Sequence, residues 1–235
     1  MNLRLVWIPI LTAAAGGMTC WLMLTGAASC EEVKVVKLPQ PRTDGTISVE
    51  KALAGRRSIR TFAQKPVTLA EVSQLLWAAQ GITRKRGGAE LRTAPSAGAL
   101  YGLETYLEAA NVTGLAPGLY RYTPQGHTLT FLSPGDHREA LSKAAFNQTC
   151  IREGAALIIF AGIYERVVKK YVERGVKFVH MEAGHAAENV YLEAEALGLG
   201  TVAAGSFDEK EATRILNLPA NEEPLYIMPV GKKVE

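Results

Sequence analysis

Residues 155–161 form a continuously apolar segment, Ala-Ala-Leu-Ile-Ile-Phe-Ala, and this segment constrains the fold more than any other. A strand with one face in water alternates apolar and polar side chains, so an unbroken apolar run predicts burial on both faces. Layers of structure must then cover both sides of the sheet. Strand patterns at 104–112, 118–122 and 127–132, the last two joined as a hairpin, occur along the chain between helical patterns. We therefore predict an α+β or three-layer α/β/α fold.

The helices are predicted from capping residues and apolar spacing. Thr68 and Glu71 fit a capping box, in which each side chain accepts a hydrogen bond from the other residue's backbone N–H. Trp77, within the helix that follows, is assigned to core packing, with contact to a planar ligand as the alternative. Residues 82–92 are polar, contain Gly87-Gly88 and are predicted to be a loop. Further helices are predicted at 49–54, 164–173, 178–197 and 208–216, and a final strand at 224–230.

The N-terminus differs in composition from the rest of the chain. Arg4 is its only charged residue before position 31, and residues 5–29 exceed the roughly 20 residues that span a bilayer. Small residues at 26–30 suit signal processing. Cleavage after Ala28 or Ser29, lipidation at Cys30 and retention as an anchor remain alternatives, beside a buried structural helix. We expect residues 1–30 to be a signal peptide or membrane anchor of an exported, periplasmic or membrane-attached protein.

The charge and cysteine content exclude several classes of protein. A net charge of +3, with both signs mixed throughout, does not indicate a nucleic-acid binder. Residues 31–47 contain two prolines and are predicted to be an extended tether before a folded domain at 48–235. Cys150 is the single cysteine of that domain, which excludes a disulfide framework, and it is assigned to packing. His127, beside the hairpin turn, is predicted to be exposed.

The segment Arg56-Arg57-Ser58-Ile59-Arg60 concentrates three guanidinium groups and a hydroxyl within five residues. Each guanidinium is a planar donor that can meet two phosphate oxygens, and Ser58 adds a neutral donor. The segment follows the predicted helix at 49–54. It predicts a phosphate site, and the alternative is a solvated basic turn.

Three other stretches could complete a cofactor site. Lys232 and Lys233 could approach the same phosphate, and the small-residue loops at 94–99 and 202–206 could line a flat ring. The sequence has no P-loop, nucleophile elbow or metal-binding histidine pair, and no Gly-x-Gly-x-x-Gly fingerprint. The combination suits a mononucleotide cofactor that needs few protein acids or bases.

These motifs, taken in order, resemble the nitroreductase superfamily. The resemblance rests on Arg-Arg-Ser-Ile-Arg (56–60), Ala-Pro-Ser-Ala-Gly-Ala-Leu-Tyr (94–101), Gly-His-Ala-Ala-Glu-Asn-Val-Tyr-Leu-Glu-Ala (184–194), Gly-Leu-Gly-Thr (198–201) and Pro-Val-Gly-Lys (229–232). The Pro-Ser-Ala-Gly segment is most similar to the branch of SagB/ThcOx-type oxidoreductases. The resemblance implies a three-layer α/β/α fold with a mainly antiparallel central sheet, two FMN cofactors and an intertwined homodimer.

The resemblance also implies roles for individual residues. Arg56, Ser58 and Arg60 would bind the FMN phosphate and ribityl chain, with Arg57 as a weaker candidate. Lys232, or Lys233 in its place, would add a phosphate contact. Two loops would lie along the ring: one, expected from the partner subunit, consists of Pro95, Ser96, Ala97 and Gly98, and the other, near the reactive N5 edge, of Ala203, Ala204 and Gly205.

The expected function is that of an FMN-dependent oxidoreductase. A ping-pong transfer of hydride or electrons through flavin N5 to a small organic acceptor would need no catalytic amino-acid side chain. The donor would be NAD(P)H or a membrane or protein donor. Many relatives have Pro and Glu where this chain has Ala203-Ala204-Gly205, and Tyr101-Gly102 replaces the Tyr-Pro of the close branch, so substrate and reductant stay open. The alternatives are a non-catalytic flavin-binding module and an envelope interaction protein.

Overall fold

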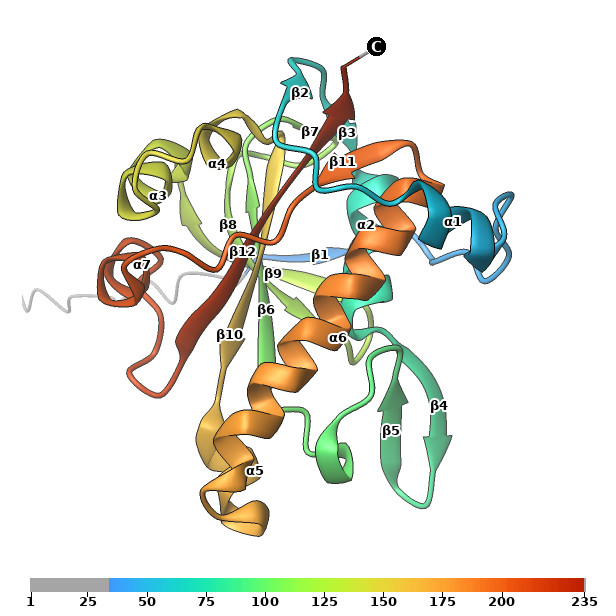
Figure 1. Cartoon of the computed structure of the whole chain (residues 1–235), viewed down its shortest axis with the longest axis vertical. Helices are drawn as coiled ribbons and strands as arrows, with labels where there is room; N and C mark the ends of the chain where they lie inside the picture. Colours follow the sequence, from blue (N-terminus) through green and yellow to red (C-terminus); the bar gives the residue numbers. More distant parts are fainter. Residues whose placement is uncertain (1–33, 235) are drawn as a thin grey trace, which may run out of the picture. The chain divides into compact units, whose positions relative to one another are not determined.

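An eight-stranded antiparallel sheet organises residues 34–234, the part of the chain that the computed structural model describes. Within these residues the strand order is β1-β9-β8-β6-β10-β12-β11, and β2 also pairs with β12 (Figure 1). The strands are β1 (Val35–Lys37), β2 (Phe62–Ala63), β6 (Leu103–Ala109), β8 (Gly118–Thr123), β9 (Thr128–Pro134), β10 (Ala156–Gly162), β11 (Leu199–Thr201) and β12 (Glu223–Lys233).

Helices cover both faces of this sheet, as the apolar run predicts. Figure 1 shows α2 (Leu69–Gln80) and α6 (Arg174–Ala196) on one side, and α3 (Arg138–Ala144), α4 (Thr149–Glu153) and α7 (Glu209–Ile215) on the other. Along β10, Ile158 and Phe160 belong to the core cluster under α2 and α6, whereas Leu157 and Ile159 belong to the cluster on the opposite face. Each of these four side chains is at most 1% exposed. The predicted three-layer α/β/α fold is confirmed.

The predicted capping box starts α2. Thr68 Oγ1 accepts a hydrogen bond from Glu71 N at 3.2 Å, and Glu71 Oε2 accepts one from Thr68 N at 2.8 Å. Such a cap stabilises a helix by about 1 kcal/mol. The long helix α6 begins at Arg174, four residues before the predicted start at 178. Two further helices, α1 (Val49–Gly55) and α5 (Tyr164–Tyr171), pack against α6.

The predicted tether at 31–47 is wrong at residues 35–39, which belong to the folded domain. β1 pairs with β9, with Val36 opposite Leu129 in the register. Leu38 is 2% exposed and belongs to the core cluster under α2 and α6. The carbonyl of Pro39 accepts a hydrogen bond from Ser73 Oγ at 2.6 Å. An edge strand of three residues has too short a pattern to be recognised in the sequence, but its backbone still completes the sheet.

Two smaller predictions are also corrected. Residues 82–92 form a hairpin of β4 (Ile82–Arg86) and β5 (Ala89–Arg92), because Gly87 and Gly88 adopt positive φ and turn the chain back. His127 is 9% exposed instead of solvated. Its Nε2 lies 2.7 Å from Ser73 Oγ and its Nδ1 lies 2.8 Å from Tyr122 Oη, so the tertiary fold supplies partners that make burial of the imidazole possible.

One further strand pair and one short helical turn lie outside the main sheet. β3 (Val67–Thr68) pairs in parallel with β7 (Val112–Thr113). A single 3₁₀ turn, η1 (Ala97–Ala99), lies in the predicted Pro-Ser-Ala-Gly loop, with Gly98 at φ 62°. Residues 34–234 contain no helix that is both long and apolar enough to cross a membrane. The predicted signal peptide or anchor at 1–30 lies outside the described residues.

Candidate functional site

The arginine cluster begins where α1 ends and is fixed beside β11. Arg56 is the C-cap of α1, and its N–H donates to Ala52 O at 2.8 Å. Ser58 then forms a parallel bridge with Thr201, and Ile59 N donates to Thr201 O at 2.9 Å. The cluster therefore lies next to the strand that leads into residues 202–206, as a shared cofactor site requires.

Tyr191, on α6, connects the cluster to that loop. Its hydroxyl lies 3.1 Å from Ser58 Oγ and accepts a hydrogen bond from Ala203 N at 2.8 Å. The guanidinium carbon of Arg56 lies 5.2 Å from the centre of the same ring, within the range of a cation–π contact. No pattern in the sequence marks Tyr191 as a site residue. It lies inside the quoted motif at 184–194, but a tyrosine at a helical position carries no signal of its own.

Arg57 and Arg60 differ in what they contact. Arg57 Nη1 donates to the carbonyl oxygens of Ala54 at 3.0 Å and of Arg56 at 2.7 Å, so its guanidinium closes the end of α1. Arg60 is exposed and makes no hydrogen bond or ion pair within residues 34–234. Its charge is close enough to Cys150 to favour the thiolate, although burial, the larger effect, raises the pKa of that thiol. Cys150 is 4% exposed in the second core cluster, which confirms its packing assignment.

The two terminal lysines reach the same region but are held by carboxylates. Lys232 is paired in register with Leu199 and Ala63, and its Nζ lies 2.5 Å from Glu71 Oε1. Partial burial opposes ionisation of Glu71, yet hydrogen bonds from Lys232 and Thr68 hold its pKa below the ordinary value. Lys233 Nζ lies 2.6 Å from Glu195 Oε2, one turn of α6 beyond Tyr191.

The loop at 203–205 is held by backbone hydrogen bonds at Ala204 and is exposed to solvent at Gly205. Ala204 is buried and exchanges two backbone hydrogen bonds with Ile227, each 3.0 Å long. Gly205 is exposed, and a Cβ added there would meet the Tyr226 ring at 3.1 Å. The absence of a side chain at Gly205 therefore leaves the backbone close to an aromatic surface.

The loop at 95–98 contacts a different part of α6 from the part that contacts the arginine cluster. Ser96 Oγ donates to Glu182 Oε2 at 2.6 Å and accepts from Tyr101 N at 2.9 Å. Glu182 and Tyr191 are nine residues apart, which is about 13 Å along a helix. The structure thus brings together the arginine cluster, the 203–205 loop and the lysines, but not residues 95–98.

Glu182 is the buried anchor of the 95–98 loop. It is 2% exposed, and burial raises the pKa of its carboxyl although Ser96 and the N–H of Gly102 donate to it. Its Oε1 has no partner among the described residues. On the outer side of the loop, a Cβ added at Gly98 would meet Tyr171 Oη at 2.8 Å and Lys170 Nζ at 3.1 Å. In the sequence, Lys170 and Tyr171 belong to a charged helical pattern that gives no sign of this contact.

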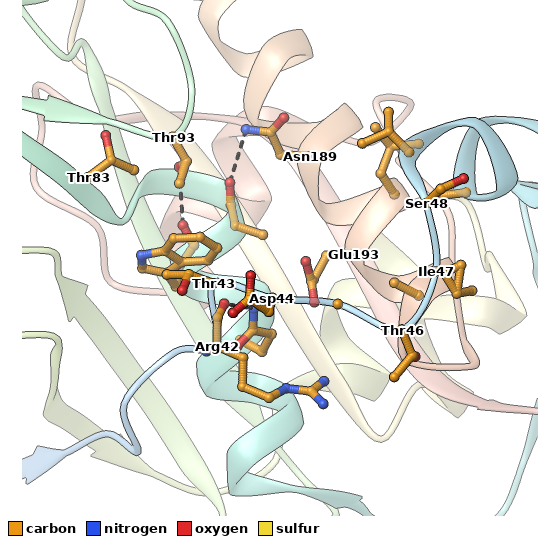
Figure 2. A pocket seen from close by; sticks show the side chains of 18 residues that line it. Arg42, Thr43, Asp44, Thr46, Ile47, Ser48, Thr83, Thr93, Asn189 and Glu193 are labelled. Atoms are coloured by element: carbon orange, nitrogen blue, oxygen red, sulfur yellow. Dashed lines mark hydrogen bonds between the residues drawn. The ribbon is translucent and has the colours of Figure 1, made fainter.

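A pocket of about 480 Å³ lies beside this region, between residues 42–49, α2 and α6. Figure 2 shows Asn189 and Glu193 of α6 facing it, with Thr93 and the 42–48 segment on the other sides. Trp77 also lines it and is half-buried, so this side chain has open space on one side instead of being enclosed in the core. None of the predicted cofactor-binding residues lines this pocket.

The residues present fit a phosphate-bearing cofactor. A phosphate needs donors that can turn towards it, and the exposed Arg60 and Ser58 and the half-exposed Arg56 meet that condition. Arg57, Lys232 and Lys233 fit less well because each is already engaged by a carbonyl or a carboxylate. The donor set Arg56, Ser58 and Arg60 is therefore the core of the candidate site.

Comparisons with known proteins give a family and several relatives. The model of the Nitroreductase family matches residues 53–232. A protein of Methanocaldococcus jannaschii, named as a candidate nitroreductase, is 43% identical over 189 residues, which cover 80% of this chain and 93% of that protein. The crystal structure of a candidate nitroreductase from Ralstonia eutropha JMP134 matches with a TM-score of 0.73 and 30% identity, over 86% of this chain and 90% of that one.

A more distant structure shares the fold. The NADPH:FMN oxidoreductase of Vibrio harveyi, solved with NAD⁺, matches with a TM-score of 0.58 and 19% identity, over 80% of this chain and 69% of that one. The family match covers most of the chain and agrees with the observed layers and motif positions. The chain belongs to the nitroreductase family.

Proposed function

We propose that this protein is an FMN-dependent oxidoreductase. The observation that carries the proposal is the contact of Tyr191 with both the Arg56–Ser58 segment and the backbone of Ala203. It joins a phosphate-binding donor set to a small-residue loop in a fold whose family consists of oxidoreductases. FMN, when bound, would supply the redox centre that accepts electrons from a donor and passes them to a small organic acceptor in a ping-pong sequence.

The protein's own residues would bind and orient that cofactor. Arg56 and Arg60 would neutralise the phosphate, and Ser58 would donate one hydrogen bond to it. The backbone of Ala203, Ala204 and Gly205 would lie along the ring, where missing side chains permit close approach. Positive charge from these arginines would also favour the anionic form of a bound reduced flavin.

We further propose that the site is completed by a second copy of the chain. Residues 95–98 lie about 13 Å along α6 from Tyr191, so in one chain they do not meet the arginine cluster. The outer face of α6 is available for a partner: Met181 is 46% exposed, and open space surrounds Gly184. A homodimer would place one chain's Pro95, Ser96, Ala97 and Gly98 against the other chain's cofactor.

The same proposal includes the electron donor, the branch of the nitroreductase superfamily and the cellular location of the protein. The donor would be NAD(P)H or, if residues 1–30 export or anchor the protein, a membrane or protein donor. The Pro-Ser-Ala-Gly segment supports the SagB/ThcOx-type branch. Fractionation of cells that produce the full chain would test export, and a cytosolic product of unprocessed mass would contradict it.

The first experiment is an absorbance spectrum of the purified protein after FMN is added and excess removed. We expect flavin bands at about one FMN per chain. Arg60→Ala should lose most of that flavin while the fold is retained by circular dichroism, whereas Arg84→Ala, an exposed arginine on β4, serves as the matched control. A folded wild-type protein that stays colourless, or equal flavin content in both variants, would refute the proposed site.

The second candidate is a flavin-binding module without turnover. It is favoured by the pairing of Lys232 with Glu71 and of Lys233 with Glu195, because lysines that are already neutralised would add little positive charge to stabilise a reduced, anionic flavin during turnover. Stopped-flow reduction of the FMN-loaded protein with NADH, NADPH and dithionite separates the two. Reduction by dithionite alone, with no reoxidation by quinone or nitroaromatic acceptors, would favour the module.

A further inference from the structure

We propose that the pocket between residues 42–48, α2 and α6 binds a small planar organic cation (Figure 2). Its volume of about 480 Å³ lies within the range of small-molecule sites in proteins. The proposal does not depend on the flavin site, because the pocket is lined by other residues.

The wall formed by residues 42–48 is held at its Arg42 end by α2 and leads at Ser48 into α1. Gln74, 6% exposed on α2, accepts a hydrogen bond from Arg42 N at 2.8 Å and donates one to Arg42 O at 3.1 Å. Upstream, Pro39 is bound by Ser73, and β1 is paired with β9. Because these contacts hold the wall at its Arg42 end, part of the pocket is ordered before a ligand arrives, which lowers the entropic cost of binding.

The lining groups recognise a flat ring that carries hydrogen-bond donors. Trp77 offers an aromatic surface, and planar cations bind indole rings more favourably than other aromatic side chains. Asn189 Nδ2 donates to Ala78 O at 3.0 Å, which fixes the amide and leaves its Oδ1 as an acceptor. Thr93 Oγ1 donates to Trp77 O at 3.1 Å, which holds Thr93 beside the backbone of Trp77.

Glu193 supplies the charge that selects a cation. It is half-buried, and burial raises the pKa of its carboxyl, although a hydrogen bond from Gln74 and the charge of Arg42 act in the opposite direction. No ion pair of the described residues involves Glu193, so its burial is only partly compensated, and a bound cation would remove that cost.

The other two charged residues lie at the rim. Arg42 and Asp44 are both exposed, and Figure 2 shows the Arg42 guanidinium extending away from Asn189 and Thr93. Glu193 is the only half-buried one of the three charged lining residues, so its carboxylate is the charge that a ligand at the inner wall would meet, with Arg42 acting on it from the rim. An anionic ligand would meet this carboxylate directly, which argues against a phosphate or a carboxylic acid.

This pocket is separate from the candidate flavin site. Glu193 and Tyr191 are two residues apart on α6, and a helix turns about 200° over two residues, so the two side chains point to opposite sides. Tyr191 faces the arginine cluster, while Glu193 faces the pocket. Ligand binding here therefore need not displace FMN.

Titration calorimetry of the full-length protein with three ligands of equal shape tests the proposal. Benzamidine, benzamide and benzoate present the same ring with an amidinium, a neutral amide or a carboxylate. We expect the Kd of benzamidine to be at least about tenfold lower than that of benzamide, with no detectable heat from benzoate. In Glu193→Gln, which keeps the shape and a hydrogen-bonding group, benzamidine should lose about tenfold in affinity and approach benzamide.

A matched variant controls for changes elsewhere on the helix. Glu188→Gln removes an exposed carboxylate of α6 that does not line the pocket, so it should leave the Kd of benzamidine unchanged. Three results would overturn the proposal: no binding of benzamidine, equal binding of benzamide or benzoate, or the same affinity in the Glu193 and Glu188 variants. Circular dichroism of each variant shows whether the fold is retained.

Discussion

Replacing Tyr191 by Phe tests whether one hydroxyl group holds the candidate site together. The change removes the acceptor of the Ala203 N–H and the partner of Ser58 Oγ, at 2.8 Å and 3.1 Å, and keeps the ring beneath Arg56. A net hydrogen bond is worth about 0.5–1.5 kcal/mol, and a donor left unsatisfied at a half-buried position costs about 1–3 kcal/mol. We expect the free energy of unfolding to fall by about 1–3 kcal/mol.

Urea denaturation of the wild type and the variant measures this loss, with Tyr226→Phe as the control. Tyr226 is also half-buried but makes no side-chain hydrogen bond among residues 34–234, so its variant should stay within about 0.5 kcal/mol of the wild type. FMN affinity should fall in Tyr191→Phe alone, because the 203–205 backbone and Ser58 lose their common support. Equal stability and equal FMN affinity in the two variants would refute the reasoning.

Two further predictions concern the core and the buried carboxyl. Ile158 is 1% exposed in the central strand, so Ile158→Ala should lower the free energy of unfolding by about 2–5 kcal/mol. Leu132 is 46% exposed, so Leu132→Ala should change this free energy by less than about 1 kcal/mol. Comparable losses of the two variants in urea denaturation would contradict the assigned burial. Because the pKa of Glu182 is raised in the folded state above its ordinary 4.5, the folded protein binds the proton more tightly. The protonated carboxyl of Glu182 therefore contributes to the free energy of unfolding below pH 4.5, and this contribution is lost as the pH rises through the raised pKa. The stability of the wild type relative to Glu182→Gln should fall over that range, and a constant difference would show that Glu182 keeps its ordinary pKa.

Patterns local in sequence determined the layers of the fold. The apolar run at 155–161 predicted a strand covered on both faces, and Ile158 and Leu157 do point into two different cores. The capping box at Thr68 and Glu71 placed the start of α2 because its hydrogen bonds join residues three apart. Such signals involve neighbouring residues, so the sequence alone carries them.

Contacts between distant residues were decided only by the tertiary structure. Ser58 and Tyr191 are 133 residues apart, and Lys232 meets Glu71 across 161 residues, so no spacing in the sequence reveals either pair. The strand β1 is too short to show a pattern, and it exists because the edge of β9 offers unpaired backbone groups. His127 is buried because Ser73 and Tyr122 supply hydrogen bonds to its ring. The sequence specified which chemical groups are present, and the folded sheet determined which of them meet, because it brings distant parts of the chain within hydrogen-bonding distance.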